Sequence, residues 1–140
     1  MNEELETKEG YFVGKVILFV DDNDSIRTYN SFPLRAQGAT VLTAQNGQEG
    51  LDIIQESIRG DCPRFDLIIT DYEMPIMDGE ELLEALGESD HSKNIPFIFS
   101  SGAFTEELEE RLSKDPRVKS FLEKPFSFDE LITTVRKVFK

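Results

Sequence analysis

A cluster of acidic residues directly follows a short apolar run near the start of the chain. The segment VILFV, residues 16–20, continues into Asp21, Asp22, Asn23 and Asp24. Burying an unpaired carboxylate is costly, and like charges a few ångströms apart repel each other. A chain that places carboxylates at the end of a buried strand therefore has a cation or a chemical task for them. Mg²⁺, a hard cation, prefers such oxygen ligands.

Other chemically competent residues also follow apolar runs. Asp71 follows FDLIIT, Ser100 and Ser101 follow PFIF, and Lys124 closes the segment FLEK. If these runs are parallel strands, their carboxyl ends meet at one edge of a sheet, where open α/β sheets bind ligands. A carboxylate nucleophile, a metal, a lysine and a hydroxyl are the components needed for phosphoryl transfer onto an aspartate.

The elements that must position these residues alternate along the chain. Continuous apolar runs predict strands covered on both faces, at 16–20, 40–43, 65–70, 96–100 and 120–122. Apolar residues at helical spacing predict helices at 25–37, 47–59, 79–86, 105–114 and 127–139. Five strands alternating with five helices indicate an α/β three-layer sandwich with a parallel sheet.

Two helix starts and one proline carry more detailed expectations. Thr105 and Asp24 are suited to N-cap the helices that follow them. Pro33 lies inside the first predicted helix, where a missing N–H and a bulky ring favour a kink or a broken turn.

Composition limits the classes of protein to which the chain can belong. The 140 residues predict one domain, with a flexible acidic tail at 1–12 and the folded domain at 13–140. A net charge of −13 argues against binding to nucleic acid or anionic membrane surfaces. No apolar run approaches the ~20 residues that span a bilayer. The single cysteine, Cys62, suits a reducing cytosol and is interpreted as incidental, and the single histidine, His91, as an exposed loop residue.

Four motifs in this order resemble the receiver domain of two-component response regulators: VILFVDD, DYEMPIMDG, SSGA and KPF. The resemblance runs from about Lys15 to the C-terminus. It implies a flavodoxin-like (βα)5 sandwich with a five-stranded parallel sheet in the order 2-1-3-4-5. It also implies a cytoplasmic signalling phosphoacceptor that catalyses only its own phosphorylation and dephosphorylation, rather than an enzyme with separate substrates.

The resemblance assigns a role to each motif residue. Asp71 would accept the phosphoryl group and, with Asp21, Asp22 and the backbone carbonyl of Glu73, hold Mg²⁺, with Mn²⁺ as an alternative. Lys124 would pair with the phosphoryl group, followed by a Lys124–Pro125 peptide bond that is often cis in this family. Ser101 would be the switch hydroxyl, since that residue precedes a small one, Gly102; strand alternation alone leaves Ser100 as a competitor. The remaining assignments are Phe121 as the switch aromatic and Glu73 and Ala103 as rate-modulating positions.

The resemblance also implies partners. A histidine kinase or histidine phosphotransfer protein would donate the phosphoryl group. A downstream protein would bind the face formed by the helix at 105–114, the strand at 120–122 and the helix at 127–139. We expect a single-domain regulator without an output module, as a monomer or weak dimer. The alternatives are a receiver taken from a hybrid histidine kinase and a receiver-fold adaptor that acts without phosphorylation.

Two other classes can produce an acidic strand end. An EF-hand loop needs Gly at its sixth position, where this chain has Ile26. Haloacid dehalogenase phosphatases end a strand in D-x-D, which Asp22-Asn23-Asp24 imitates, but Ile26 fits that pattern poorly and the chain is too short for a substrate-binding cap. Both classes are therefore disfavoured.

Overall fold

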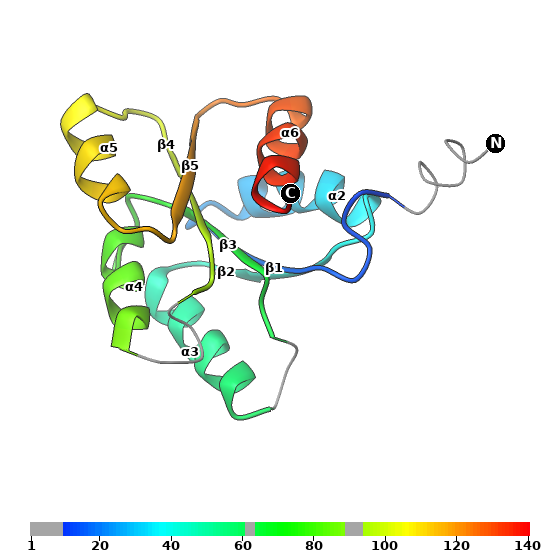
Figure 1. Ribbon diagram of the computed structural model, residues 1–140, viewed down its shortest axis with the longest axis horizontal. Coiled ribbons are helices and arrows are strands. Elements are labelled where there is room, and N and C mark those ends of the chain that lie inside the picture. The colour runs from blue at the N-terminus through cyan, green and yellow to red at the C-terminus, as the bar shows by residue number, and fades with distance from the viewer. Residues whose placement is uncertain (1–9, 61–63, 89–93) are drawn as a thin grey trace.

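A five-stranded parallel sheet forms the centre of the molecule, and helices cover both of its faces (Figure 1). The structure, a computed structural model, describes residues 10–60, 64–88 and 94–140. The strands lie in the order β2-β1-β3-β4-β5, and every neighbouring pair is parallel. They are β1 (Val16–Val20), β2 (Thr40–Ala44), β3 (Leu67–Asp71), β4 (Phe97–Ser101) and β5 (Val118–Glu123). The predicted flavodoxin-like α/β fold and its strand order are confirmed.

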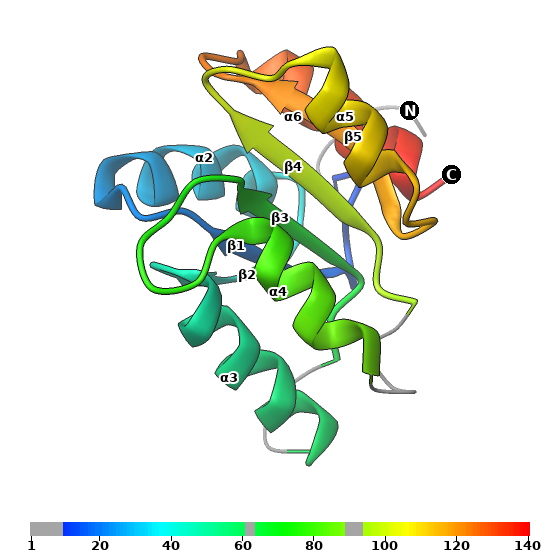
Figure 2. The same ribbon diagram turned by 90° about the vertical axis from the view of Figure 1, so that its left-hand side faces the viewer.

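The helices divide between the two faces of the sheet. In Figures 1 and 2, α2 and α6 lie on one side, and α3, α4 and α5 lie on the other. The helices are α2 (Asp24–Ala36), α3 (Gly47–Ile58), α4 (Gly79–Ala85), the short 3₁₀ helix η1 (Leu86–Glu88), α5 (Glu106–Ser113) and α6 (Phe128–Val138). This division produces the predicted three layers.

Burial on both faces explains why the strands are continuously apolar. Along β1, Phe19 packs into the core beneath α2 and α6, whereas Val20 packs into the core beneath α3, α4 and α5. Successive side chains of a strand point to opposite faces, so a sheet covered on both sides needs apolar residues at every position. The apolar runs end at the carboxyl edge of the sheet, and polar side chains begin there.

Helix starts agree with the sequence in type but differ at one residue. Asn23, not Asp24, caps α2: its side chain accepts a hydrogen bond from the N–H of Ile26. Asp24 is the first helical residue and forms an ion pair with Arg27 instead. Thr105 caps α5, as predicted, by accepting from the N–H of Leu108. Asn was the better cap because its own backbone is extended while that of Asp24 is already helical.

Pro33 does not break α2. The helix is continuous from Asp24 to Ala36, so the predicted broken turn is wrong. Pro33 lies in the last turn, and its carbonyl still accepts a hydrogen bond from the N–H of Gln37. Pro33 is buried, and the helix continues past it.

The packed part of the chain begins earlier than the predicted domain boundary. Phe12, placed in the tail by its sequence context, is 1% exposed and joins the core beneath α2 and α6. Its N–H donates to the carbonyl of Gln37, and its ring meets Phe139 edge-on. Residues 1–9, Cys62 and His91 lie outside the described residues. Within the described part of the chain, no helix is long and apolar enough to cross a bilayer.

Candidate functional site

The fold brings three aspartates together at the carboxyl edge of the sheet. Asp71 is the last residue of β3, and Asp21 and Asp22 directly follow β1, the neighbouring strand. One carboxylate oxygen from each lies within 4.8 Å of the others. Asp21 is fully buried and Asp71 is 7% exposed, whereas Asp22 faces solvent. Parallel pairing therefore gathers residues that are 50 positions apart in the chain.

Lys124 supplies the only ammonium that the described residues place in this cluster. Its Nζ lies 2.8 Å from Oδ2 of Asp21 and 3.2 Å from Oδ2 of Asp71. Burial opposes protonation of Lys124, but its hydrogen bond to Asp21 and the charge of Asp71 outweigh burial and raise its pKa. One positive charge cannot neutralise three carboxylates, so a negative charge remains at the edge.

The excess negative charge acts on Asp71. The pKa of this carboxyl is raised to about 6: burial is the largest cause, the charge of Asp21 adds to it, and Lys124 only partly opposes them. A second cation beside Asp71 would favour the charged form of its carboxyl group. The donor set, three carboxylates with one exposed to solvent, fits a hard divalent cation that keeps some of its waters. The residues present therefore fit Mg²⁺.

Hydrogen bonds hold Asp21 in place, and close packing surrounds the backbone of Asp71. The N–H of Asn23 donates to Oδ1 of Asp21 at 2.9 Å, and the Arg27 guanidinium donates to the carbonyl of Asp21 at 2.6 Å. At the other strand, a Cβ on Gly79 would lie 2.5 Å from the carbonyl oxygen of Asp71, so only glycine fits there. The segment after Asp71 can therefore fold back closely onto the end of β3.

The loop between β3 and α4 is tightly constrained. The N–H of Met77 donates to the carbonyl of Pro75, which makes Ile76 the centre of a γ-turn with φ of 71°. The carbonyl of Met77 in turn accepts from the N–H of Gly47 at the start of α3. Such a φ is rare for a β-branched residue, and it persists because the hydrogen bonds on both sides determine it.

The structure places both candidate serines at the end of β4. The strand register pairs Ser100 with Asp71 and Ser101 with Glu123, and both serines are buried. Oγ of Ser101 accepts from the N–H of Ala103, and its carbonyl accepts from the N–H of Lys124. Ser101 is thus linked directly to the loop after β4 and to the lysine. Gly102, the small residue that follows Ser101, has open space around it: a Cβ there would meet nothing within 4 Å.

The remaining predicted residues surround this edge. The Lys124–Pro125 peptide bond is cis, as expected. Phe121 lies on β5, half-buried, with its ring 5.2 Å from that of Phe104 in an edge-on arrangement. Glu73 and Ala103 are exposed.

Sequence reasoning missed two kinds of supporting residue. Gly79 was expected only as the start of the helix at 79–86, whereas its close approach to the Asp71 carbonyl makes it part of the site. An Asp-Gly pair just ahead of a helical pattern was the available signal, since Asp78 also caps α4. Arg27 was missed because a lone arginine inside a helix carries no such signal.

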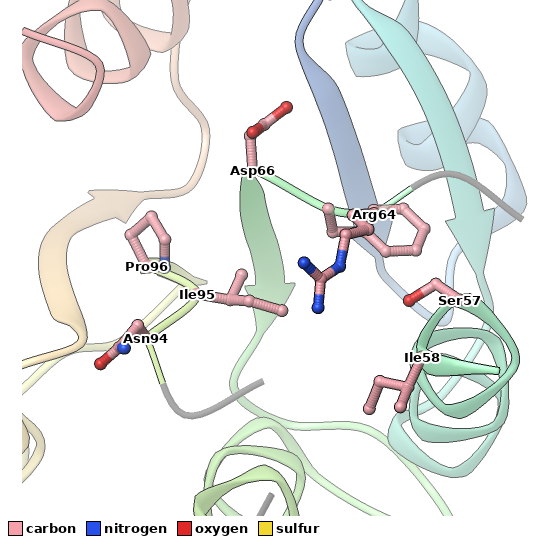
Figure 3. Close-up of a pocket in the computed structure, with 8 residues that line it drawn as sticks. Ser57, Ile58, Arg64, Asp66, Asn94, Ile95 and Pro96 are labelled. Carbon is pink, nitrogen blue, oxygen red and sulfur yellow. The ribbon is translucent and has the colours of Figure 1, made fainter. Parts of the chain in front are cut away.

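A cavity elsewhere in the molecule shares no residue with this cluster. It has a volume of about 350 Å³ and lies by the amino ends of β3 and β4 and the last turn of α3. Figure 3 shows the Arg64 guanidinium directed into the space beside Ile58 and Ile95. The carboxylate of Asp66 is engaged with the N–H of Val16 at 2.8 Å. The chemistry of the carboxyl edge is therefore separate from this cavity.

The strand order places the chain in the flavodoxin-like class of α/β proteins, which bind ligands at the carboxyl edge of the sheet. Comparison with known proteins gives the family. The family model for the response regulator receiver domain matches residues 17–136. The chain therefore belongs to the response regulator receiver domain family of two-component signalling.

Relatives and solved structures agree with this assignment. Over 124 residues, 89% of the chain, it is 36% identical to the sensor kinase CckA of Brucella abortus, and those residues make up 12% of the kinase. The chain spans between 8% and 17% of four such curated sensor kinases. Chemotaxis protein CheY4 of Vibrio cholerae superposes with a TM-score of 0.78 at 32% identity, covering 89% of this chain and 98% of CheY4. The receiver domain of hybrid histidine kinase CckA gives 0.68 at 31% identity, covering 89% and 99%.

Proposed function

We propose that this receiver domain accepts a phosphoryl group on Asp71 from a phosphohistidine of a partner protein. The observation that carries the proposal is the contact of the Lys124 ammonium with the carboxylates of Asp71 and Asp21, in a cluster that still retains excess negative charge. This arrangement offers a nucleophile, a cation for the phosphoryl oxygens and ligands for Mg²⁺.

The chemistry is a single displacement at phosphorus. An oxygen of the Asp71 carboxylate forms the new O–P bond as the N–P bond of the phosphohistidine breaks, and the electron pair remains on the imidazole nitrogen, which takes up a proton. Lys124 pairs with an equatorial phosphoryl oxygen. Asp21, Asp22, Asp71 and the carbonyl of Glu73 would hold Mg²⁺, which when bound would neutralise further charge on those oxygens.

The phosphoryl group then changes a protein-binding surface. Ser101 bonds a phosphoryl oxygen and gives up the hydrogen bond that it accepts from Ala103. Phe121, half-buried against Phe104, turns inward as the loop between β4 and α5 moves. The surface formed by α5, β5 and α6 changes with it and is read by a downstream protein. Hydrolysis of the acyl phosphate resets the domain, and exposed Glu73 and Ala103 influence the rate at which water attacks.

The donor is a histidine kinase or a histidine phosphotransfer protein. Support comes from the family, whose curated relatives here include sensor kinases that contain a similar segment. The chain spans a minor part of those kinases. The proposed chemistry is the same for a segment of a hybrid kinase and for a single-domain regulator.

Phosphoramidate, a small donor with an N–P bond, tests the proposal without knowledge of the partner. The wild-type protein, incubated with phosphoramidate and Mg²⁺, should gain the mass of one phosphoryl group, and Asp71→Asn and a chelated sample should not. Folded wild type that gains no mass in excess Mg²⁺ would favour the phosphorylation-independent adaptor.

A pair of variants distinguishes the two serines. With the same donor, Ser101→Ala should weaken the structural response to phosphorylation, observed as the loss of amide shift changes in β5 and α5, while Ser100→Ala should preserve it. The opposite pattern would assign the switch hydroxyl to Ser100.

A further inference from the structure

Three side chains from different elements form a polar network beside the phosphoacceptor strand. Arg111 on α5 donates to both carboxylate oxygens of Glu80 on α4, from Nε at 3.1 Å and from NH2 at 2.8 Å. The hydroxyl of Tyr72 donates to Glu80 at 3.2 Å and accepts from NH2 of Arg111 at 3.1 Å. The arginine fork thus contacts both partners at once.

The electrostatics of the network keep each member in the required protonation state. The hydrogen bond from Arg111 holds the pKa of Glu80 below its usual value. Burial and the neighbouring charge of Glu80 raise the pKa of Tyr72, so its hydroxyl keeps its proton and donates it to the carboxylate. The three groups are therefore complementary throughout the neutral pH range.

The position of Tyr72 gives the network access to the reaction centre. Tyr72 directly follows Asp71, its N–H donates to the carbonyl of Ser100, and its carbonyl accepts from the N–H of Gly79. Its ring also meets Phe99 edge-on, with centroids 6.4 Å apart. The backbone of Tyr72 is therefore held on both sides, so displacement of its side chain would also displace the end of β3.

The position of Arg111 links the same network to the surface proposed to switch. α5 begins at Glu106, shortly after Ser101 at the end of β4, and it lies with α4 on one side of the sheet (Figure 2). Among the residues that the structure describes, no other ion pair joins α4 to α5. Arg111 thus connects α5 to Glu80 on α4 and to Tyr72 after β3 through polar contacts.

We infer that Arg111, through Glu80 and Tyr72, is a positioning residue that restrains α5 in its unphosphorylated arrangement and so sets the ease of the phosphorylation-linked switch. This inference rests on the proposed function of Asp71. The restraint acts on the arrangement with α5 held to α4, and a contact that stabilises one of two states makes the other less populated. When phosphorylation proceeds from the other state, its rate falls in proportion to the population of that state, which the contact reduces.

Removal of the network should therefore accelerate the reaction. With phosphoramidate and Mg²⁺, Arg111→Ala should gain the phosphoryl mass about two- to fivefold faster than wild type, the range expected for a partly exposed ion pair. Arg111→Lys, which keeps the charge but loses the fork, should fall between the two. Arg35→Ala on α2 is the matched control, because it removes the same charge while its hydrogen bond to the Val41 carbonyl lies outside the network.

A second readout follows the restraint itself, without metal or donor. Deuterium uptake at residues 106–113 of the unphosphorylated protein should rise in Arg111→Ala and stay at the wild-type level in Arg35→Ala.

The outcomes separate the two proposals. Wild type that takes up no phosphoryl group would contradict the proposed function, and this inference would fall with it. Phosphorylated wild type with an Arg111→Ala rate equal to or below that of Arg35→Ala would overturn the inference alone. General destabilisation cannot imitate the expected result, since loss of folded protein slows phosphorylation.

Discussion

The chemistry of Asp71 depends on where its charge can be balanced. The carboxyl lies against the buried Asp21 and shares one lysine with it, and its pKa is raised to about 6. Ionisation of a carboxyl group in this environment is costly, and it becomes favourable when a divalent cation is bound next to the group. The electrostatic repulsion among the carboxylates is relieved when Mg²⁺ binds, and this relief favours binding of the metal.

This leads to a prediction about stability and pH. Because the folded-state pKa of Asp71 lies above its ordinary value of 3.8, the folded protein binds the proton more tightly than the unfolded chain does. Stability from this group is thus present at low pH and is lost as pH rises from about 4 through about 6. In metal-free buffer at pH 7, Asp71→Asn should increase the free energy of unfolding by about 1 kcal/mol, after allowance for solvent screening.

Urea unfolding of both proteins between pH 4.5 and pH 7.5 measures the difference. The gain should grow with pH and level off above neutrality. If the difference in stability between the two proteins is the same at both ends of this range, or if the variant is less stable than wild type at pH 7, Asp71 is not under electrostatic strain.

At the level of single residues, the sequence located the acids and the lysine because strand ends in a parallel sheet have a fixed destination. Strand alternation alone did not decide between Ser100 and Ser101, and only the resemblance favoured Ser101. Both serines are buried, and the register places Ser100 beside Asp71 while Ser101 contacts Ala103 and Lys124. Register depends on pairing with β3 and β5, which a single strand does not encode.

Among the elements, α4 determines how the segment after β3 approaches the site. Gly79 is its first residue, and Asp78 caps it in a capping box with Glu81. The N–H of Gly79 bonds the carbonyl of Tyr72, and the absence of a side chain at Gly79 lets the helix start against Asp71 and Phe99. The helix start and the phosphoacceptor are thus parts of one packed unit.

Gly79→Ala tests this packing. A Cβ at residue 79 would lie 2.5 Å from the Asp71 carbonyl oxygen and 2.8 Å from the Phe99 ring. The resulting displacement should cost about 1–3 kcal/mol of folding free energy. Gly102→Ala is the control, because a Cβ there meets nothing within 4 Å, and its cost should stay within about 0.5 kcal/mol. Equal stability of the two variants in urea unfolding would show that α4 can shift freely.

The elements themselves were largely predictable, and their errors have physical causes. Each predicted strand and helix exists, because continuous apolar runs and helical spacing respond to burial on both sheet faces. β3 begins at Leu67 and includes Asp71, two residues later than predicted at its start, because pairing rather than hydrophobicity defines its ends. The contacts among Tyr72, Glu80 and Arg111 could not be predicted, since they join residues 8 and 31 positions apart, on the loop after β3 and on two separate helices.

For the whole molecule, the net charge of −13 acts together with the local cluster. An acidic surface raises the local concentration of cations in general and repels anions, including small phosphodonors. Specific binding at the aspartates must therefore be separated from general screening by salt.

Mg²⁺ should stabilise the protein through the cluster. At a Mg²⁺ concentration five times its Kd, the free energy of unfolding should rise by about 1 kcal/mol. Asp22→Asn should lose most of this gain, because it removes the solvent-facing ligand without disturbing the buried pair. Thermal unfolding at constant ionic strength, with NaCl replacing MgCl₂ in the control, measures the effect. An equal response of the two proteins would indicate screening alone.

The most direct test of the account is to find which atom carries the phosphoryl group. Protein treated with acetyl phosphate and Mg²⁺ can be reduced with borohydride, which converts an acyl phosphate of aspartate to homoserine, and the digested peptides can then be sequenced by mass spectrometry. The account predicts homoserine at residue 71 and at no other aspartate. Homoserine at residue 21 or 22, or a phosphoryl group that resists reduction, would contradict it.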